Sequence, residues 1–344
     1  MISNPTPQRA LRGHRPARDV PRVRNSADHH AWLVRHLTAR DRWLVRMLFE
    51  HKVFTTHQIV DLAFPTRRAA NLRLLNLHKW GVLHRFQPHR DLGSHPMHYV
   101  LDTAGATVLA HEDGIEPKTM NYSRDREVGR AYSLQLAHTV GCNSLLTTLV
   151  HHSRQPNTTG TLTAWWSAAR CGRHWGDIIT PDGYGRWREA GRDVEWFIEF
   201  DFGTEQLSRL AAKLIRYEQL ASATGITTPI LLWLPTPERE ATVRQVLAKT
   251  LQSLDHPRRV PVATTNAAAA TNPVDMTEPR WRRIGDADSA GRTRLVDLPS
   301  LWPDLAEPQP HAPGDGRTRQ TVDERPDPAP PRPTPPFGPT DYGR

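Results

Sequence analysis

The 344-residue chain lacks any apolar run long enough to cross a membrane, and it contains only two cysteines. A membrane-spanning helix needs about 20 consecutive apolar residues, and the arginine-rich start has no apolar core of the kind that export signals carry. Cys142 and Cys171 stand apart without CxxC spacing, which argues against a disulfide framework and against a closed zinc site. These absences predict a cytoplasmic protein with no membrane partner.

The charge that is present is mainly basic. Lys and Arg number 45 against 36 Asp and Glu, which gives a formal charge of +9 and a sequence pI near 10.0. A surplus of this sign favours a polyanionic partner such as nucleic acid. Nothing in the sequence indicates a small-molecule substrate.

Composition predicts four parts. Residues 1–30 carry six arginines among prolines and small residues, which is typical of a disordered basic arm that can also follow DNA phosphates. Periodic apolar patterns predict two folded domains, at 31–112 and 127–266. Residues 303–344 hold 12 prolines in 42 positions, and the apolar pattern has already faded before them, so 267–344 is expected to be a disordered proline-rich tail.

The first folded domain is expected to contain three short helices and a β-hairpin. Thr38, followed three residues later by Asp41, matches a capping box at the start of a helix. The third helix is expected at Thr66–Trp80, and extended segments follow at Val82–Phe86 and His98–Leu101. This order predicts a winged helix, whose third helix enters the major groove of double-stranded DNA.

Basic and amide side chains in the third helix and the hairpin are the candidate DNA contacts. Residues 66–90 include six Lys or Arg and no acidic residue, as a phosphate-contacting surface requires. The candidates are Arg67, Arg68, Asn71, Arg73, Lys79 and Arg85. Winged helices also serve as protein-docking modules, so DNA contact is one of two interpretations at this point.

The second folded domain is expected to be a mixed α/β sandwich, which makes the whole chain α+β. Helices are predicted at 127–152 and at 237–254. A further helix is predicted between them, beginning after an N-cap at Thr204. The predicted strands cover 162–169, 174–180, 194–201, 229–234 and 260–264. Strands on either side of a long helix imply a crossover connection.

Carboxylates gather around the strand at 194–201. Its alternation places Glu199 and Asp201 on the same face, and Asp182 belongs to a Pro-Asp-Gly turn at the end of a neighbouring strand. Lys213, on the following helix, is long enough to reach back towards the strand end. Closely spaced carboxylates with a nearby ammonium form an arrangement that binds Mg2+ and hydrolyses phosphodiesters.

Each of these residues also has an ordinary structural interpretation. Asp182 suits turn chemistry, Glu199 and Asp201 suit an exposed strand edge that resists aggregation, and Lys213 suits a solvated helix face. The combination favours a metal site, because neighbouring carboxylates on a strand rich in aromatic residues repel one another unless a cation compensates them.

The order helix, three strands, helix, strand, with Asp182 in its turn and Glu199-Phe200-Asp201 on the long strand, resembles the PD-(D/E)XK nuclease fold. In that fold acidic residues hold Mg2+ and a lysine polarises the attacking water or the phosphate. The resemblance therefore implies metal binding by Asp182, Glu199 and Asp201, and catalytic roles for these three and Lys213. The pattern's lysine, two residues after Glu199, is replaced by Asp201, so its role would move to Lys213.

Residues from about 38 to 255 also resemble the replication-relaxation family of chromosomes, plasmids and integrated elements. The matching phrases are Arg73–Leu83, the helix around His138, Pro181-Asp182-Gly183, and Glu199-x-Asp201-x-Gly-Thr followed by Lys213 and Tyr217. The resemblance implies a DNA-binding protein of plasmid or mobile-element replication or transfer, with replication or conjugation proteins as partners. Metal-dependent nicking or cleavage is one expectation. A non-catalytic accessory factor or transcriptional regulator with a degenerate nuclease fold is the other.

Overall fold

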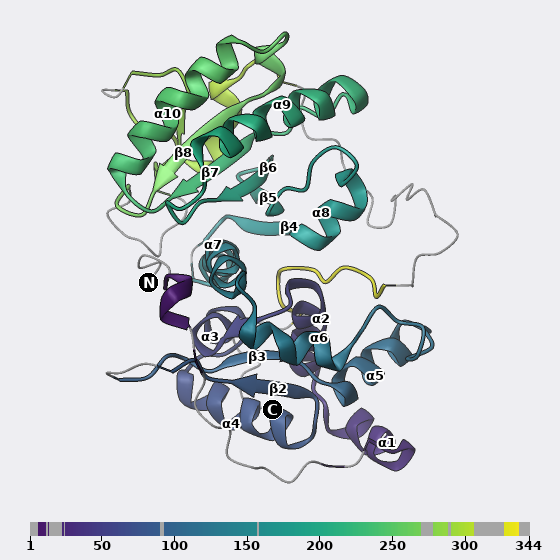
Figure 1. The fold of residues 1–344 in the computed structure, drawn as a ribbon. Coiled ribbons are helices and arrows are strands. Elements are labelled where there is room, and N and C mark those ends of the chain that lie inside the picture. Colours follow the sequence, from purple (N-terminus) through teal and green to yellow (C-terminus); the bar gives the residue numbers. More distant parts are fainter. Residues whose placement is uncertain are drawn as a thin grey trace. The chain divides into compact units, whose positions relative to one another are not determined.

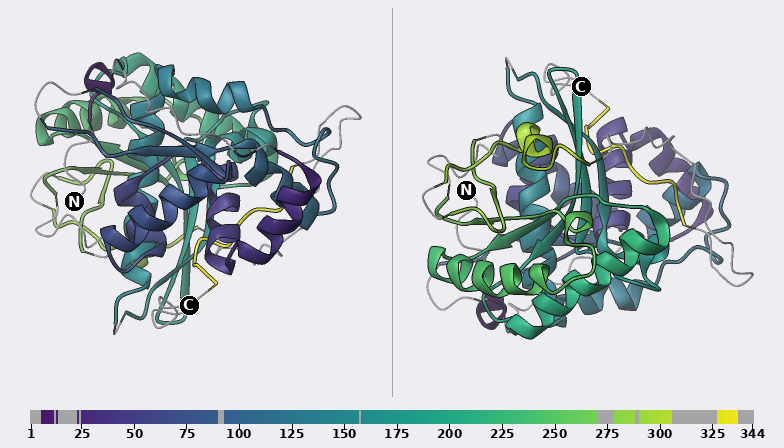
Figure 2. Two further views of the ribbon diagram at one scale, coloured as in Figure 1. Left: turned by 90° about the horizontal axis from the view of Figure 1, so that it is seen from below. Right: turned by 90° about the horizontal axis from the view of Figure 1, so that it is seen from above.

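A computed structural model gives the fold of the protein (Figures 1 and 2). It describes residues 6–11, 13, 23, 25–89, 93–156, 158–269, 278–287, 290–305 and 327–336. Its described residues form two compact units, of which the first comprises those within 6–147 together with 327–336, and the second those within 148–305. The described part is α+β with two sheets, as the sequence predicts. None of its helices is long and apolar enough to cross a membrane.

The first unit contains a small antiparallel sheet among helices, in the strand order β1-β3-β2. Its elements are α1 (Ala27–His36), α2 (Ala39–His51), β1 (Phe54–Thr55), α3 (Thr56–Ala63), α4 (Arg67–Lys79), β2 (Leu83–Phe86), β3 (His98–Leu101), α5 (Thr103–Glu112) and α6 (Arg124–Gly129). The three helices and the hairpin of the sequence prediction correspond to α2, α3, α4 and the β2–β3 pair, with β1 inserted between α2 and α3.

Local capping explains where these helices begin. The predicted capping box of Thr38 and Asp41 is present at the start of α2. Thr55 and Gln58 form a second capping box ahead of α3, and Thr66 caps α4 by accepting a hydrogen bond from the amide of Ala69. Such side chains satisfy amides that have no partner within the helix.

Two helices occupy the region where the sequence predicts one long helix. The helix expected at 127–152 is interrupted, because α6 is followed by a 3-10 turn at Arg130–Tyr132 and α7 begins only at Leu136 (Leu136–Ser153). Ser133 between them is extended, and its hydroxyl accepts a hydrogen bond from the amide of Gln135. A serine that bonds to nearby backbone competes with helix formation.

Part of the expected N-terminal arm is ordered as well. A 3-10 turn at Gln8–Leu11 (η1) buries Leu11, and the Gln8 side chain exchanges hydrogen bonds with the carbonyl of Ser133 and the amide of Ala137. Most of the arm's arginines lie outside the described residues.

The second unit is built on a six-stranded sheet in the order β4-β5-β6-β7-β8-β9. Its elements are β4 (Thr161–Ser167), α8 (Ala168–Trp175), β5 (Gly183–Glu189), β6 (Arg192–Phe200), α9 (Leu207–Thr224), β7 (Ile230–Leu234), α10 (Pro237–Gln252), η3 (Pro257–Arg259), β8 (Val262–Asn266), β9 (Arg282–Arg283) and η4 (Leu295–Leu301). Strands β4, β5 and β6 are antiparallel, β6, β7 and β8 are parallel, and β9 is antiparallel to β8.

Helices α9 and α10 lie beside each other and share one apolar core with the sheet (Figures 1 and 2). Leu210 and Leu214 of α9 and Val243 and Leu247 of α10 pack there, against residues such as Leu232 of β7. The apolar stripe that the sequence shows on α9 therefore positions this helix, and the side chains at its edge, over the strand that precedes it.

The strand expected at 174–180 is a wrong prediction. Helix α8 continues to Trp175, and the strand that pairs with β6 is β5, after the Pro-Asp-Gly turn. Strand β5 begins with the sequence Gly-Tyr-Gly-Arg. Its sequence gives only a weak strand signal, because glycine weakens strand interiors. The fold nevertheless requires Gly185, since a Cβ atom there would lie 2.4 Å from Cζ2 of Trp196 on β6. Asp182 consequently stands ahead of its strand.

The sequence predicts a tail from residue 267, but folded structure continues beyond that position. Strand β9 adds to the edge of β8, and Trp281 beside it is buried. Helix η4 buries Leu295, Val296 and Leu298 and packs against β5 and β6. Within the proline-rich region, residues 327–336 are described as part of the first unit, and the rest of 306–344 lies outside the described residues.

Candidate functional site

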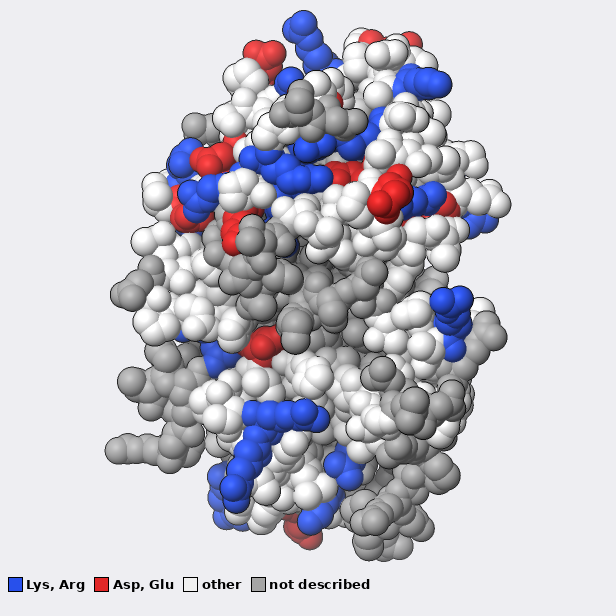
Figure 3. All heavy atoms as spheres, turned by 90° about the vertical axis from the view of Figure 1, so that its left-hand side faces the viewer, with Lys and Arg blue, Asp and Glu red and all other residues white. Residues whose placement is uncertain are grey.

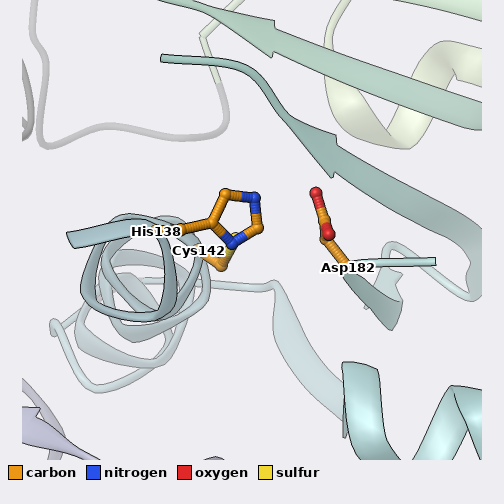
Figure 4. A group of neighbouring side chains, drawn as sticks. All are labelled: His138, Cys142 and Asp182. Atoms are coloured by element: carbon orange, nitrogen blue, oxygen red, sulfur yellow. The ribbon is translucent and has the colours of Figure 1, made fainter. Parts of the chain in front are cut away.

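The fold brings Asp182 and Glu199 to neighbouring positions on adjacent strands. Gly183 of β5 pairs with Ile198 of β6, so the residue before Gly183 lies beside the residue after Ile198. The amide of Phe200 donates to Oδ2 of Asp182 over 2.9 Å, which holds this carboxylate at the start of β5. Figure 4 shows the Asp182 side chain projecting from that end of the strand.

Two side chains of α9 hold the Glu199 carboxylate, which is 2% exposed. The Lys213 ammonium lies 2.7 Å from Oε2, and the Tyr217 hydroxyl donates to Oε1 over 2.6 Å. Burial and the nearby charge of Asp182 raise the pKa of Glu199 to about 7, although Lys213 and Tyr217 act in the opposite direction. Glu199 is therefore a carboxylate that another cation would stabilise further.

Lys213 and Tyr217 respond to the same cluster. Burial lowers the pKa of Lys213, but the charges of Glu199 and Asp182 outweigh it and hold this pKa above its usual value, so the side chain is a cation. Burial and Glu199 raise the pKa of the Tyr217 hydroxyl, which remains a neutral donor. The two residues are four apart on a helix, a spacing that places them on one face.

Asp201 has a different set of partners. Its Oδ2 atom accepts from Nε of Arg239 on α10 over 2.8 Å, and its Oδ1 atom accepts from the amides of Gly203 and Glu205. The carboxylate thus closes the turn between β6 and α9. This turn is why α9 begins after Gln206 and not after Thr204, the N-cap expected from the sequence.

Three of the four predicted site residues of this unit, Asp182, Glu199 and Lys213, therefore meet, while Asp201 is engaged by Arg239. From the sequence, Tyr217 stands out only as part of the family resemblance, and Arg239 does not stand out. The spacing from Lys213 could have identified Tyr217. Arg239 carries no comparable signal, because its partner lies 38 residues away in the chain.

Helix α7 carries a smaller contact between functional side chains. His138 and Cys142 lie one turn apart on it, with Nδ1 of the imidazole 3.7 Å from the Sγ atom (Figure 4). This is the i, i+4 spacing of helical neighbours, and it makes the pair a local feature of the helix.

Four of the six candidate DNA contacts are exposed on α4, namely Arg67, Arg68, Asn71 and Lys79. Arg85 lies on β2 and is half-buried, with a hydrogen bond to Tyr99. Figure 3 shows Lys and Arg side chains on one face of the surface, some of them beside Asp or Glu.

Arg73 is held within the first unit. Its Nε atom lies 3.0 Å from Oδ1 of Asp41, a second guanidinium nitrogen bonds to Asp41 and to the carbonyl of His36, and the group stacks over the ring of Trp80. The position that the sequence offers as a DNA contact therefore joins α4 to the start of α2.

Comparison with known proteins gives one match. The model of the replication-relaxation family matches residues 45–231, a range that includes α4 and all of Asp182, Glu199 and Lys213. No curated protein and no solved structure matches the chain.

Proposed function

The chain belongs to the replication-relaxation family, and from this premise we propose that it is a DNA-binding protein acting in the replication or transfer of a plasmid or other mobile element. We further propose that its first unit binds double-stranded DNA and that its second unit carries a metal-dependent, nuclease-like site. Replication or conjugation proteins of the same element are the expected partners, in the cytoplasm.

The order of elements in the first unit supports DNA binding. Helix α2, strand β1, helices α3 and α4, and the β2–β3 hairpin follow one another in the order of a winged helix, in which the third helix reads the major groove. Helix α4 holds that position. It exposes Arg67, Arg68 and Asn71 near its start, where such a helix contacts bases and phosphates, and it has no acidic residue.

The observation that carries the nuclease-like proposal is the buried Glu199 beside Asp182, with Lys213 at 2.7 Å. Along the chain the elements run α7-β4-α8-β5-β6-α9-β7, with β6 parallel to β7, which apart from the short α8 is the order of the PD-(D/E)XK fold. The donor set fits Mg2+, because this ion accepts one or two carboxylates and keeps several waters. Asp182 and Glu199 would hold it.

Each residue has a role that follows from its contacts. When bound, Mg2+ supplies an acidified water and a positive charge for the phosphate. Asp182 is fixed by the Phe200 amide and Glu199 by the Tyr217 hydroxyl, so both carboxylates are oriented in advance. The Lys213 ammonium is positioned to counter the charge that develops on the phosphate oxygens.

The test is nicking of supercoiled plasmid with Mg2+ or Mn2+. We expect the wild type to nick, Glu199→Gln to lose nicking while keeping duplex affinity, and Asp193→Asn to match the wild type. Asp193 is the matched control, since it lies on the same strand but pairs with Arg188 near the surface. Nicking by Glu199→Gln at the wild-type rate would identify a contaminant and remove the proposal.

A second candidate function is a non-catalytic accessory factor with a degenerate nuclease fold. Asp201 favours it, because an acidic residue bound to Arg239 occupies the position where the fold's pattern has lysine. Under this alternative no variant or wild-type protein nicks plasmid, and duplex affinity is intact. A regulator of transcription would also bind duplex DNA without nicking plasmid. Binding at a promoter would distinguish it from an accessory factor of replication or transfer.

DNA binding is tested separately with four of the candidates, of which Arg67, Asn71 and Lys79 are exposed and Arg85 is half-buried. Arg67→Ala and Asn71→Ala should reduce preference among duplex sequences. Lys79→Ala and Arg85→Ala should weaken every duplex and reduce the slope of log affinity against log salt by about one each. Lys249→Ala, an exposed lysine on α10, is the control. Equal affinity and salt slope in all five proteins would reject α4 and the hairpin as the DNA surface.

A further inference from the structure

A proline-rich stretch near the end of the chain packs on the first unit. Residues 327–336 contain six prolines in ten positions, and four of these, Pro328, Pro331, Pro333 and Pro335, are buried. Figure 1 draws the stretch in yellow beside α2. Burial of so many prolines contrasts with the solvated tail that the composition alone predicts.

Two polar side chains of the unit bind the backbone of this stretch. The indole Nε1 of Trp43 on α2 donates to the carbonyl of Arg332 over 2.8 Å, and the Trp43 side chain is 6% exposed. The amide of Ala329 donates to Oδ2 of Asp113 over 3.0 Å. Asp113, at the end of α5, is itself fixed by Arg46 of α2, whose guanidinium contacts both of its oxygens.

The spacing of these contacts matches a polyproline helix. Proline fixes φ near −65°, and a polyproline II helix has three residues per turn, so residues three apart lie on the same side. The two bonded backbone groups belong to Ala329 and Arg332, which are three apart, and the buried Pro328 and Pro331 have the same separation. Over residues 328–332, the backbone groups that bond to Asp113 and Trp43 thus share one side of the chain. Pro333 and Pro335 are also buried, at a spacing of two residues, in the part of the stretch that bends.

Charge is also matched at the start of the stretch. Burial lowers the pKa of Lys52, which follows α2, and the carboxylate of Asp327 is among the charges that oppose this effect. The Lys52 ammonium donates to the carbonyl of Phe49 and lies over the Phe49 ring. The surface therefore offers an aromatic donor and a carboxylate acceptor to the backbone of the stretch, and the Lys52 ammonium is near enough to the Asp327 carboxylate for the two charges to attract.

We propose that this surface, formed by Trp43, Arg46, Lys52 and Asp113, is a binding site for proline-rich peptides, which the chain's own segment 327–336 occupies. Aromatic side chains that donate to the carbonyls of a preformed polyproline helix are a general means of recognising such peptides, because the ligand loses little entropy on binding. A proline-rich partner must then displace the segment. This inference concerns a surface separate from α4 and from Asp182 and Glu199, and it does not depend on the proposed function.

The test uses full-length protein and a fluorescein-labelled peptide of residues 327–336, with binding followed by anisotropy. The wild type should bind the peptide weakly, because a tethered competitor acts at about millimolar effective concentration. Full-length protein carrying Pro328→Ala, Pro331→Ala and Pro333→Ala in its own segment should bind it about tenfold more tightly. Equal affinity of the two proteins, or no binding by the second, would overturn the proposal.

Trp43 supplies the specific control. Trp43→Phe, introduced into the tail-substituted protein, keeps the aromatic ring and removes the donor, so peptide affinity should fall about fivefold. Trp302→Phe in the second unit should leave it unchanged, and a peptide with Pro328→Ala and Pro331→Ala should not bind. Peptide affinity that survives Trp43→Phe without change contradicts the assignment.

A measurement on the unmodified protein guards against variants that do not fold. The amide of Ala329 is hydrogen-bonded to Asp113, so its hydrogen exchange should be at least about tenfold slower than in the free peptide, because exchange requires the segment to open. Exchange at the free-peptide rate would overturn the proposal.

Discussion

Lys213 reaches from α9 back to the preceding strand and places its ammonium 2.7 Å from Oε2 of Glu199. The Glu199 side chain is almost fully buried, whereas that of Lys213 keeps contact with solvent. A charge left alone in a protein interior is strongly unfavourable. The pair therefore couples the stability of the second unit to the integrity of the candidate site.

Replacing Lys213 with methionine should lower the free energy of unfolding at neutral pH by about 3 kcal/mol, because Glu199 loses its cation. Adding Glu199→Gln to Lys213→Met should recover most of the loss, since a neutral amide needs no counter-charge. Urea unfolding of the single and double variants measures this coupling. Arg209→Met, on the exposed side of α9, should change stability by less than about 0.5 kcal/mol. Additive effects of the two substitutions would show that the pair is not coupled.

Mg2+ should stabilise the second unit if Asp182 and Glu199 bind it. A ligand at 100 times its dissociation constant adds about 2.7 kcal/mol, and each kcal/mol raises Tm by about 2–4 °C in a domain of this size. Differential scanning calorimetry should show the rise for the wild type and for Asp193→Asn, and not for Asp182→Asn. The same rise in Asp182→Asn would place the bound ion elsewhere.

Arg73→Ala should destabilise the first unit by about 3 kcal/mol, because Asp41, which is 1% exposed, then loses its cation. Arg67→Ala removes an arginine of the same helix that is exposed, and it should change stability by less than about 0.5 kcal/mol. Thermal melts of the two variants make the comparison. If both melt as the wild type does, the ion pair of Arg73 with Asp41 contributes nothing to stability.

Acid should destabilise the second unit in part through Glu240. Burial alone would raise the pKa of this carboxyl, but hydrogen bonds from Arg292, Thr264 and Asn266 outweigh it and hold the pKa below its usual value near 4.5. A lowered folded-state pKa gives stability that is present above pH 4.5 and lost as the pH falls through the folded-state value.

Glu240→Gln removes this titration. Between pH 5 and pH 3, urea unfolding should show a smaller loss of stability for Glu240→Gln than for the wild type, although the variant is less stable at pH 7. Parallel pH profiles for the two proteins would exclude Glu240 as a source of acid sensitivity.

Local signals were sufficient for much of the fold. The Thr38–Asp41 pair and Thr66 each mark the start of a helix through a contact with a residue three positions later. The alternation of apolar and polar residues up to Glu199 marks β6. Such patterns depend on neighbours in the chain, so the sequence alone reveals them. The meeting of Asp182, Glu199 and Lys213 was also accessible, since adjacent strands and the following helix constrain where these residues lie.

Long-range partners account for what the sequence did not reveal. Strand β5 contains the glycine that Trp196 requires, and this need is visible only when the two strands are paired. From the sequence, Asp201 is a candidate metal ligand, and only the fold shows that Arg239 lies beside it. Arg73 is likewise a candidate DNA contact, and only the fold shows its ion pair with Asp41. The prolines of 327–336 predict disorder, because composition does not show that the indole of Trp43 binds the carbonyl of Arg332.

The late position of strand β9 in the chain has a consequence for the synthesis of the second unit. During synthesis β8 leaves the ribosome before Arg282 and Arg283, so its outer hydrogen-bonding edge has no neighbour at first. An open strand edge is a template for pairing with other chains, and partly made sheets are prone to such contacts. Between the synthesis of residues 266 and 283, the nascent protein therefore presents an open edge of β8 at which contacts with other chains can begin.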